Sequence, residues 1–281
     1  MNKLKISIVT PSYNQGAFIE ETILSIINQN YPNLEYIIID GGSTDNSVDI
    51  IRKYEKHLAY WVSEKDNGQS EAINKGFKKA TGDIICWLNS DDILIEGALN
   101  KVANIFTANK ELDLINGQTV LIDKNSNILS GHFVLKQKKW YAERGIYYIN
   151  QPSMFWRRSL LDSTGLLKED FHTLMDKEFL IRMFERNVKI GHLEKFLAGF
   201  RIHGESKSAG NPTSLKWFEE DNQKLLELYR NSYGQNPKLI TKLIYRFEKL
   251  IRGIYAKQFF FSTQWNGKNV RELNANNCAY L

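Results

Sequence analysis

Cysteine is almost absent from this chain, with only two among 281 residues. Cys86 and Cys278 lie far apart, a spacing that supports neither a disulfide framework nor a cysteine metal cluster, and we expect two reduced thiols. Long hydrophobic runs are also absent: no segment approaches the roughly 18 uninterrupted apolar residues of a membrane-spanning helix. Residues 1–9 contain no signal-peptide core. The sequence therefore predicts a cytoplasmic protein.

Most of the chain also lacks any excess of charge. The net charge is +5, and residues 214–281 hold 11 of the 37 Lys and Arg residues but only 6 of the 32 Asp and Glu residues. The first 213 residues are therefore balanced, with 26 charges of each sign. A uniformly basic nucleic-acid-binding protein would not have this arrangement of charge, and we expect no nucleic-acid partner. The basic end predicts contact with an anionic surface.

Short apolar runs alternate with amphipathic stretches in the first hundred residues. We expect buried strands at residues 6–9, 36–39, 60–62 and 84–88, separated by helices over residues 18–27, 48–54 and 72–80. Strands and helices that alternate at this spacing predict parallel pairing with right-handed crossovers, and hence a doubly wound, mostly parallel α/β sheet. Ligands of such sheets bind beyond the carboxyl ends of the strands.

The second part of the chain has a different pattern. Residues 114–122 and 128–134 predict a hairpin, a helix follows at 176–187, and mixed strand material continues to His203. The segment 204–212 is polar and contains Gly, Ser, Asn and Pro, so we place a domain boundary there. Residues 213–281 form a helical C-terminal extension, with helices expected at 214–230 and 237–257.

Polar segments follow all four predicted strands. They are Thr10-Pro11-Ser12-Tyr13-Asn14, Asp40-Gly41-Gly42-Ser43-Thr44-Asp45, Glu64-Lys65-Asp66-Asn67-Gly68-Gln69 and Asn89-Ser90-Asp91-Asp92. The adjacent carboxylates of Asp91 and Asp92 repel each other unless a cation offsets them, and a divalent ion bound to a diphosphate suits that place. Turn and helix-capping chemistry is the alternative for each segment, including Asp92.

In order and spacing these segments resemble the family 2 glycosyltransferases with the GT-A fold. The resemblance covers about residues 4–208. It also includes Gln151-Pro152-Ser153-Met154-Phe155, residues 175–182, and Arg201, His203, Ser206 and Ser208. No Gly-x-Gly-x-x-Gly segment follows the first strand, which argues against a dinucleotide-dependent oxidoreductase.

The resemblance implies a role for each matching residue. Thr10, Pro11 and Tyr13 would pack around the nucleobase, Asp40 would accept from its imide nitrogen, and Asp66 would join the nucleoside contacts. Asp91 would reach the ribose or the sugar, and Asp92 would hold a Mn²⁺ or Mg²⁺ ion that bridges both phosphates. Asp176 would be the catalytic base, while Arg201, His203 and Ser206 would steady the leaving diphosphate. For Asp176 a helix-capping role is the alternative, and for His203 a structural one.

The implied function is an inverting glycosyltransferase that moves one sugar from a nucleotide-diphosphate sugar, a UDP-sugar by preference, to a glycan or lipid-linked acceptor. Residues 1–110 would bind the donor and residues 111–212 the acceptor. No Gln-x-x-Arg-Trp segment follows Asp176, and Asn89 stands where many relatives have Asp. Because both the Gln-x-x-Arg-Trp segment and a membrane-spanning run are missing from the sequence, processive synthesis is not expected. A non-catalytic nucleotide-sugar-binding or glycan-binding module is the rival interpretation.

The predicted helix over residues 237–257 is amphipathic and basic. Asn236 and Pro237 are a typical helix start, as N-cap and first helical residue. Nine apolar residues fill one face: Leu239, Ile240, Leu243, Ile244, Phe247, Leu250, Ile251, Ile254 and Tyr255. Such a helix can lie on an anionic membrane, which would hold the enzyme on the cytoplasmic face. The alternatives are that this face packs on the catalytic domain or on a second subunit of a homo-oligomer.

Overall fold

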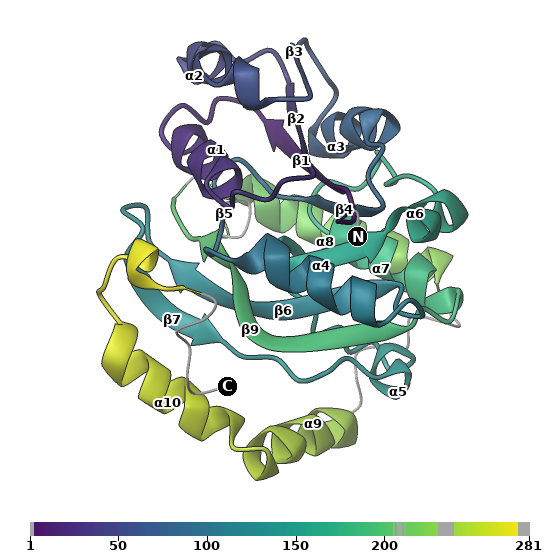
Figure 1. Ribbon diagram of the computed structural model, residues 1–281. Helices are drawn as coiled ribbons and strands as arrows, with labels where there is room; N and C mark the ends of the chain where they lie inside the picture. Colours follow the sequence, from purple (N-terminus) through teal and green to yellow (C-terminus); the bar gives the residue numbers. More distant parts are fainter. Residues whose placement is uncertain (1–2, 205, 207–209, 211, 230–238, 275–281) are drawn as a thin grey trace.

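The computed structural model describes residues 3–204, 206, 210, 212–229 and 239–274 (Figure 1). Nine strands form one mixed sheet in the order β3-β2-β1-β4-β8-β6-β9-β5, and β7 pairs with β6. The strands are β1 (Ile6–Ser12), β2 (Leu34–Asp40), β3 (Tyr60–Ser63), β4 (Ile84–Trp87), β5 (Ile93–Leu94), β6 (Leu114–Ile122), β7 (Ile128–His132), β8 (Met154–Arg157) and β9 (Ile190–Arg201). The α-helices are α1 (Ile19–Ile27), α2 (Ser47–Lys53), α3 (Gln69–Lys79), α4 (Ala98–Ala108), α5 (Lys139–Ala142), α6 (Arg158–Thr164), α7 (Met175–Glu185), α8 (Pro212–Leu228), α9 (Leu239–Ile251) and α10 (Ile254–Trp265).

The four N-terminal strands pair in parallel, which confirms the prediction from the alternating pattern. β1 lies between β2 and β4, and β3 pairs with the outer side of β2. Ser12 is opposite Asp40, and Asp40 is opposite Ser63, so these three strands end together. The polar segments that follow them therefore meet at one edge of the sheet.

The pairing of β5, β6, β8 and β9 places the end of β9 beside the segment that follows β4. The predicted hairpin is confirmed as β6 and β7, and β8 pairs antiparallel with both β4 and β6. β9 runs parallel to β6 and ends with Arg201 opposite Ile122. The short strand β5, which the sequence pattern did not predict, pairs with β9 through Ile93 and Leu94. This pairing places residues 201–203 beside Asp91 and Asp92.

A cluster of aromatic rings joins the two halves of the core. Trp87 of β4 packs edge to face on Trp156 of β8, with ring centroids 5.5 Å apart. Phe77 of α3 and Phe179 of α7 both pack on these two rings, at 5.8–6.2 Å. Trp87 and Trp156 are almost completely buried. This burial fixes α7 against the strand that leads to Asn89.

The helices beyond residue 212 contribute to both hydrophobic clusters of the molecule. Leu225 of α8 and the following Tyr229 belong to the main core. Phe261 of α10 packs on Phe133 and Phe196 in a second cluster, with centroids 5.7 and 4.7 Å away. The predicted C-terminal extension is thus helical, and in this structure it lies against the sheet (Figure 1).

One predicted helix of the extension is wrong in its boundaries. The sequence pattern indicated a single helix to about residue 257, whereas α9 ends at Ile251 and α10 begins at Ile254. Gly253 lies between them with φ +65°, a left-handed conformation that ends a helix and favours glycine. The predicted start at Asn236 and Pro237 lies outside the described residues. In the described part of the chain, no helix is long and apolar enough to cross a membrane.

Candidate active site

Asp40, at the end of β2, closes its own turn. Its Oδ2 accepts the backbone N–H groups of Gly42 (3.1 Å) and Ser43 (2.9 Å) and the hydroxyl of Ser63 (2.7 Å). Its Oδ1 accepts the Ser43 hydroxyl at 2.5 Å. The side chain is completely buried. Binding to a nucleobase imide stays a prediction, for which Oδ1, with one hydrogen bond from Ser43, is the oxygen with remaining acceptor capacity.

Asp66 joins Asp40 at the same edge, as the sequence predicted. A Cβ atom on Gly41 would lie 2.6 Å from Asp66 Oδ2, so the carboxyl group lies directly against the Gly41 backbone. Asp66 Oδ1 accepts the N–H of Gly68 at 2.9 Å. Burial, opposed by this hydrogen bond, raises the pKa of Asp66. A side chain at position 41 would therefore shift the Asp66 carboxylate from this position.

Of the three nucleobase contacts predicted at the end of β1, one is exposed to solvent. Tyr13 is 59% exposed, so its ring is available for stacking. Thr10 is completely buried, and Tyr36 donates its hydroxyl to Thr10 Oγ1 at 3.2 Å. Pro11 is buried as well. The prediction that the Thr10 side chain packs on the base therefore does not fit its position.

The two neighbouring carboxylates Asp91 and Asp92 have opposite environments. Asp92 is completely buried, and its Oδ1 accepts the Arg201 backbone N–H at 2.9 Å while Oδ2 accepts Asn89 Nδ2 at 3.3 Å. Burial, and after it the charge of Asp91, raises the pKa of Asp92 well above its usual range. Asp92, the predicted metal ligand, thus has both carboxyl oxygens bonded inside the protein, and its role as a ligand stays a prediction.

Asp91 is the partly exposed carboxylate of the pair. Its Oδ2 lies 3.1 Å from Nε2 of His203, and 20% of its side-chain surface is exposed. The His203 ring packs on Phe18 with centroids 4.5 Å apart, which fixes its orientation. Ser206 donates its hydroxyl and its N–H to the His203 carbonyl, so this buried serine stabilises the turn that carries the histidine. Ser208 lies outside the described residues.

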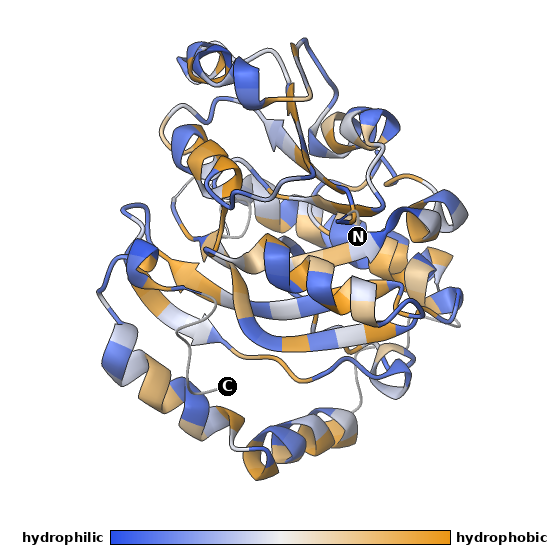
Figure 2. Cartoon of the chain, in the orientation of Figure 1, coloured by the Kyte–Doolittle hydropathy of each residue, from blue (hydrophilic) through white to orange (hydrophobic). Residues whose placement is uncertain are grey.

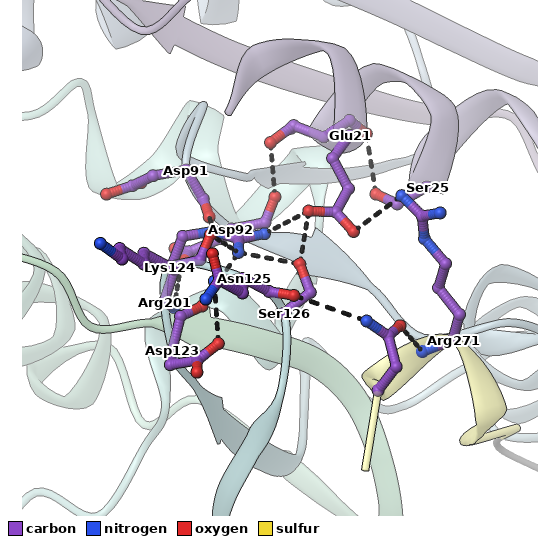
Figure 3. Close-up of polar contacts among 12 residues, drawn as sticks. Glu21, Ser25, Asp91, Asp92, Asp123, Lys124, Asn125, Ser126, Arg201 and Arg271 are labelled. Carbon is purple, nitrogen blue, oxygen red and sulfur yellow. Dashed lines mark hydrogen bonds and ion pairs between the residues drawn. The ribbon is translucent and has the colours of Figure 1, made fainter. Parts of the chain in front are cut away.

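Arg201 has a structural position, contrary to the predicted contact with the diphosphate (Figure 3). The side chain is 1% exposed. Its guanidinium donates to the carbonyls of Asp91 (2.7 Å) and Asp123 (3.0 Å), to Ser126 Oγ (2.9 Å) and to Glu21 Oε2 (2.7 Å). All of these acceptors belong to the protein itself, and Ser126 among them is buried. Arg201 therefore holds α1, the Asp91 backbone and the β6–β7 turn together.

Asp176 lies in the first turn of α7. It is partly buried, and its Oδ1 accepts the Lys177 backbone N–H at 2.7 Å. Burial raises the pKa of Asp176, which makes the carboxylate a stronger base.

Two successive residues of α3 link α7 to the end of β4. Gln69 Nε2 donates to Asn89 Oδ1 at 2.8 Å, and Ser70 Oγ lies 2.9 Å from Met175 Sδ. Through these contacts the helix turn of Asp176 and the segment of Asp91 lie at the same edge of the sheet. Asn89 accepts from Gln69 and donates to Asp92, a pairing that a carboxylate at this position could not make.

Glu178, the other carboxylate of that helix turn, is excluded as an alternative base. It is completely buried, and its oxygens lie 2.8 Å from Arg182 Nη2, 3.2 Å from Lys168 Nζ and 2.5 Å from the hydroxyl of Tyr229. These partners satisfy its charge inside the protein. Glu178 therefore joins α7 to the end of α8.

Asp221 of α8 is a functional candidate that sequence reasoning missed. It is completely buried, and its Oδ2 accepts the backbone N–H groups of residues 172, 173 and 174 at 2.6–3.0 Å, together with the Thr173 hydroxyl. No residue of α7 caps the helix itself. The signal available in the sequence was helical spacing, because Asp221 lies four residues before Leu225, on the buried face of α8. The carboxylate thus caps the turn of residues 172–174 that leads into α7, and it fixes the backbone that ends two residues before Asp176.

We expect Asp221→Ala to lower the free energy of unfolding by about 2–4 kcal/mol, because several buried N–H groups lose a charged acceptor. Chemical denaturation followed by circular dichroism measures this. Glu219→Ala, on an exposed position of the same helix, is the matched control and should change stability by less than about 0.5 kcal/mol. Equal stability of the two variants would contradict the capping role.

The fold and this site define a nucleotide-sugar glycosyltransferase of the GT-A type. The model of the family described as "Glycosyl transferase family 2" matches residues 7–166, more than half of the chain, and the protein belongs to that family.

Two relatives of known sequence cover nearly the whole chain. An uncharacterized glycosyltransferase of Nostoc sp. is 26% identical to this protein. The match covers 95% of this chain and 86% of the Nostoc sequence. The poly(ribitol-phosphate) beta-N-acetylglucosaminyltransferase TarP of Staphylococcus aureus is 24% identical over 91% of this chain and 82% of its own.

Two solved structures share the fold. S. aureus TarS residues 1–349, in complex with UDP-GlcNAc, gives a TM-score of 0.59 at 20% identity, over 79% of this chain and 67% of that one. The mannosyltransferase PcManGT of Pyrobaculum calidifontis, in complex with GDP-Man and Mn²⁺, gives a TM-score of 0.57 at 15% identity. The match covers 94% of this chain and 84% of the PcManGT chain. The predicted GT-A fold is therefore confirmed.

Proposed function

We propose that this protein is an inverting, non-processive hexosyltransferase that moves one sugar from a UDP-sugar to an acceptor hydroxyl. The observation that carries the proposal is the position of Asp176 in a helix turn that Ser70 and Gln69 of α3 link to Asn89, two residues before Asp91. The Asp176 carboxylate takes the hydroxyl proton as the acceptor oxygen bonds to the anomeric carbon and the bond to the diphosphate breaks. One displacement of this kind inverts the anomeric centre.

We propose that Asp91 and His203, in place of Asp92, hold the divalent ion. Adjacent ligands of an octahedral ion with bonds of about 2.1 Å stand about 3.0 Å apart, and the two side-chain atoms here are 3.1 Å apart. The described residues contain no group of three or more His, Cys, Asp and Glu that could hold a metal, so donor phosphates and water would complete the shell. Bound there, Mn²⁺ or Mg²⁺ would offset the charge of the leaving diphosphate.

The nucleoside would lie over the ends of β1 to β3. Tyr13 supplies an exposed aromatic face, and Asp66, whose carboxyl group lies against the Gly41 backbone, supplies a carboxylate. TarS, whose fold this chain shares, was solved with UDP-GlcNAc, which supports the choice of uridine, whereas PcManGT was solved with GDP-Man.

For the acceptor, we propose a glycan or a lipid-linked glycan used in a cell-surface polymer. By its name, TarP transfers N-acetylglucosamine to poly(ribitol-phosphate), and it is similar to this chain over most of both sequences. A relative from Bacillus subtilis that is 40% identical over 31% of this chain is named as a teichuronic acid biosynthesis glycosyltransferase. These names support a polymer acceptor.

The proposal is tested by incubating the purified protein with a panel of nucleotide sugars and Mn²⁺, and measuring release of nucleoside diphosphate. We expect slow hydrolysis of one UDP-sugar, with a β-configured product from an α-linked donor. Preference for a GDP-sugar would overturn the choice of uridine. Tight binding of a donor with no turnover, also with polymer acceptors present, would favour the non-catalytic module instead.

A further inference from the structure

The apolar face of α9 points away from the body of the protein. The side chains that α9 buries are Thr241 and Tyr245, and its Glu248 accepts from Lys138 and from the Tyr141 hydroxyl. Ten large apolar residues of α9 and α10 are exposed instead: Leu239, Ile240, Leu243, Ile244, Phe247, Leu250, Ile251, Tyr255, Phe259 and Phe260. An ordinary surface helix has the reverse arrangement. The alternative that this face packs on the catalytic domain is therefore wrong.

Specific contacts fix this orientation of the helix. Tyr245 stacks on Tyr148 with ring centroids 3.6 Å apart, and Lys138 and Tyr141 both bond to Glu248 at 2.6–2.8 Å. α10 is held by Phe261 in the second core and by Lys257, which pairs with Glu194 at 3.0 Å. A rotation that buried the apolar face would break these polar contacts. Figure 2 shows apolar residues along both helices, at the end of the molecule opposite α2 and α3.

A cationic pocket of about 230 Å³ lies beside the apolar face. Its lining comprises Tyr148, Tyr245, Tyr255, Lys242, Arg246 and Lys249. The Lys249 ammonium lies 5.3 Å from the centre of the Tyr255 ring, and burial lowers its pKa. Within the described residues, none of the three cations forms an ion pair with a carboxylate. The pocket is therefore suited to an anion.

We propose that α9 and α10 dock on an anionic lipid bilayer, with the exposed apolar residues among the acyl chains and a lipid phosphate group in the Lys242–Arg246–Lys249 pocket. An apolar face and a basic pocket side by side supply the two signals that stable membrane binding requires. A second copy is the poorer occupant, because an isologous contact through this face would bring two sets of unpaired cations together. The inference does not depend on the transfer reaction.

Flotation of the full chain with vesicles tests the proposal. We expect binding to phosphatidylglycerol vesicles that weakens with salt, and little binding to phosphatidylcholine vesicles. The triple variant Lys242→Glu, Arg246→Glu, Lys249→Glu should partition at least about 100-fold more weakly, since each cation contributes roughly a fivefold factor. Phe247→Glu should also weaken binding, through the apolar face.

Matched controls are available on α8. Lys216→Glu and Leu215→Glu, both at exposed positions, should float like the wild type. Circular dichroism and the melting temperature check that every variant folds. Absence of flotation at low salt overturns the proposal. So does a dimer in analytical ultracentrifugation that Phe247→Glu dissociates while flotation is unchanged, because the face would then belong to a second copy.

Discussion

Asp176→Asn is expected to lower kcat at least about a hundredfold while the dissociation constant for the donor stays within a few-fold. General-base catalysis contributes typically 10²–10⁴-fold, and the amide cannot accept the hydroxyl proton. Asp176 lies in the first turn of α7, and its side chain accepts the Lys177 N–H of the same turn, a bond that an amide oxygen can also accept, so the isosteric change leaves the fold intact. Steady-state kinetics and calorimetric titration of the nucleoside diphosphate measure the two quantities.

The pH profile gives a second readout of the same residue. Because burial raises the pKa of Asp176, kcat of the wild type should fall on the acid side at a higher pH than for an ordinary aspartate. Asp176→Asn should lose this acid limb. Glu185→Gln, an exposed carboxylate in the last turn of the same helix, is the matched control and should keep both rate and profile. A variant of Asp176 that turns over within a few-fold of wild type would show that the base lies elsewhere.

The edge of the sheet where the site lies could be predicted because it follows from the backbone alone. Strands that alternate with helices must pair in parallel, and their carboxyl ends then meet at one edge. Asp40 and Asp66 came together for this reason, twenty-six positions apart in the chain but next to the same glycine. The hairpin and α7 were predictable from period-2 and helical patterns in the same way.

Side-chain roles within that edge could not be predicted with equal success. Asp91 and Asp92 are adjacent in sequence, and only the position of β9 decides which one is buried, since the Arg201 N–H bonds to Asp92 Oδ1. The burial of Arg201 depends on carbonyls of the β6–β7 turn and on Glu21, which are remote in sequence. A pattern of residue types along the chain contains no information on such acceptors.

The C-terminal helices show a further limit. The amphipathic pattern of residues 239–251 was correctly identified, but the pattern alone does not say which face meets the protein. That choice is made by Glu248 and Tyr245, whose partners Lys138, Tyr141 and Tyr148 lie about a hundred residues earlier. Asp221 is a similar case, because the groups that it caps belong to the turn before α7, about fifty residues earlier in the chain.

Asp91→Asn is expected to lose most of the metal-dependent affinity for the donor, whereas Asp92→Asn should retain it within a few-fold. The first change removes a charged oxygen beside His203 that is partly exposed. The second replaces a buried carboxyl group whose raised pKa already favours the neutral form, and an amide oxygen can still accept the Arg201 N–H. Titration of UDP with and without Mn²⁺ into each variant separates the two cases.

His203→Asn should resemble Asp91→Asn, with a loss of at least about tenfold in metal-dependent affinity, since both side chains would hold the same ion. In the absence of metal, all three variants should bind UDP about as the wild type does, because Tyr13 and the Asp40 and Asp66 segments are unchanged. Equal losses for Asp91→Asn and Asp92→Asn would restore Asp92 as a ligand. If neither Asp91 nor His203 affects the metal dependence, the ion does not bind between these two residues.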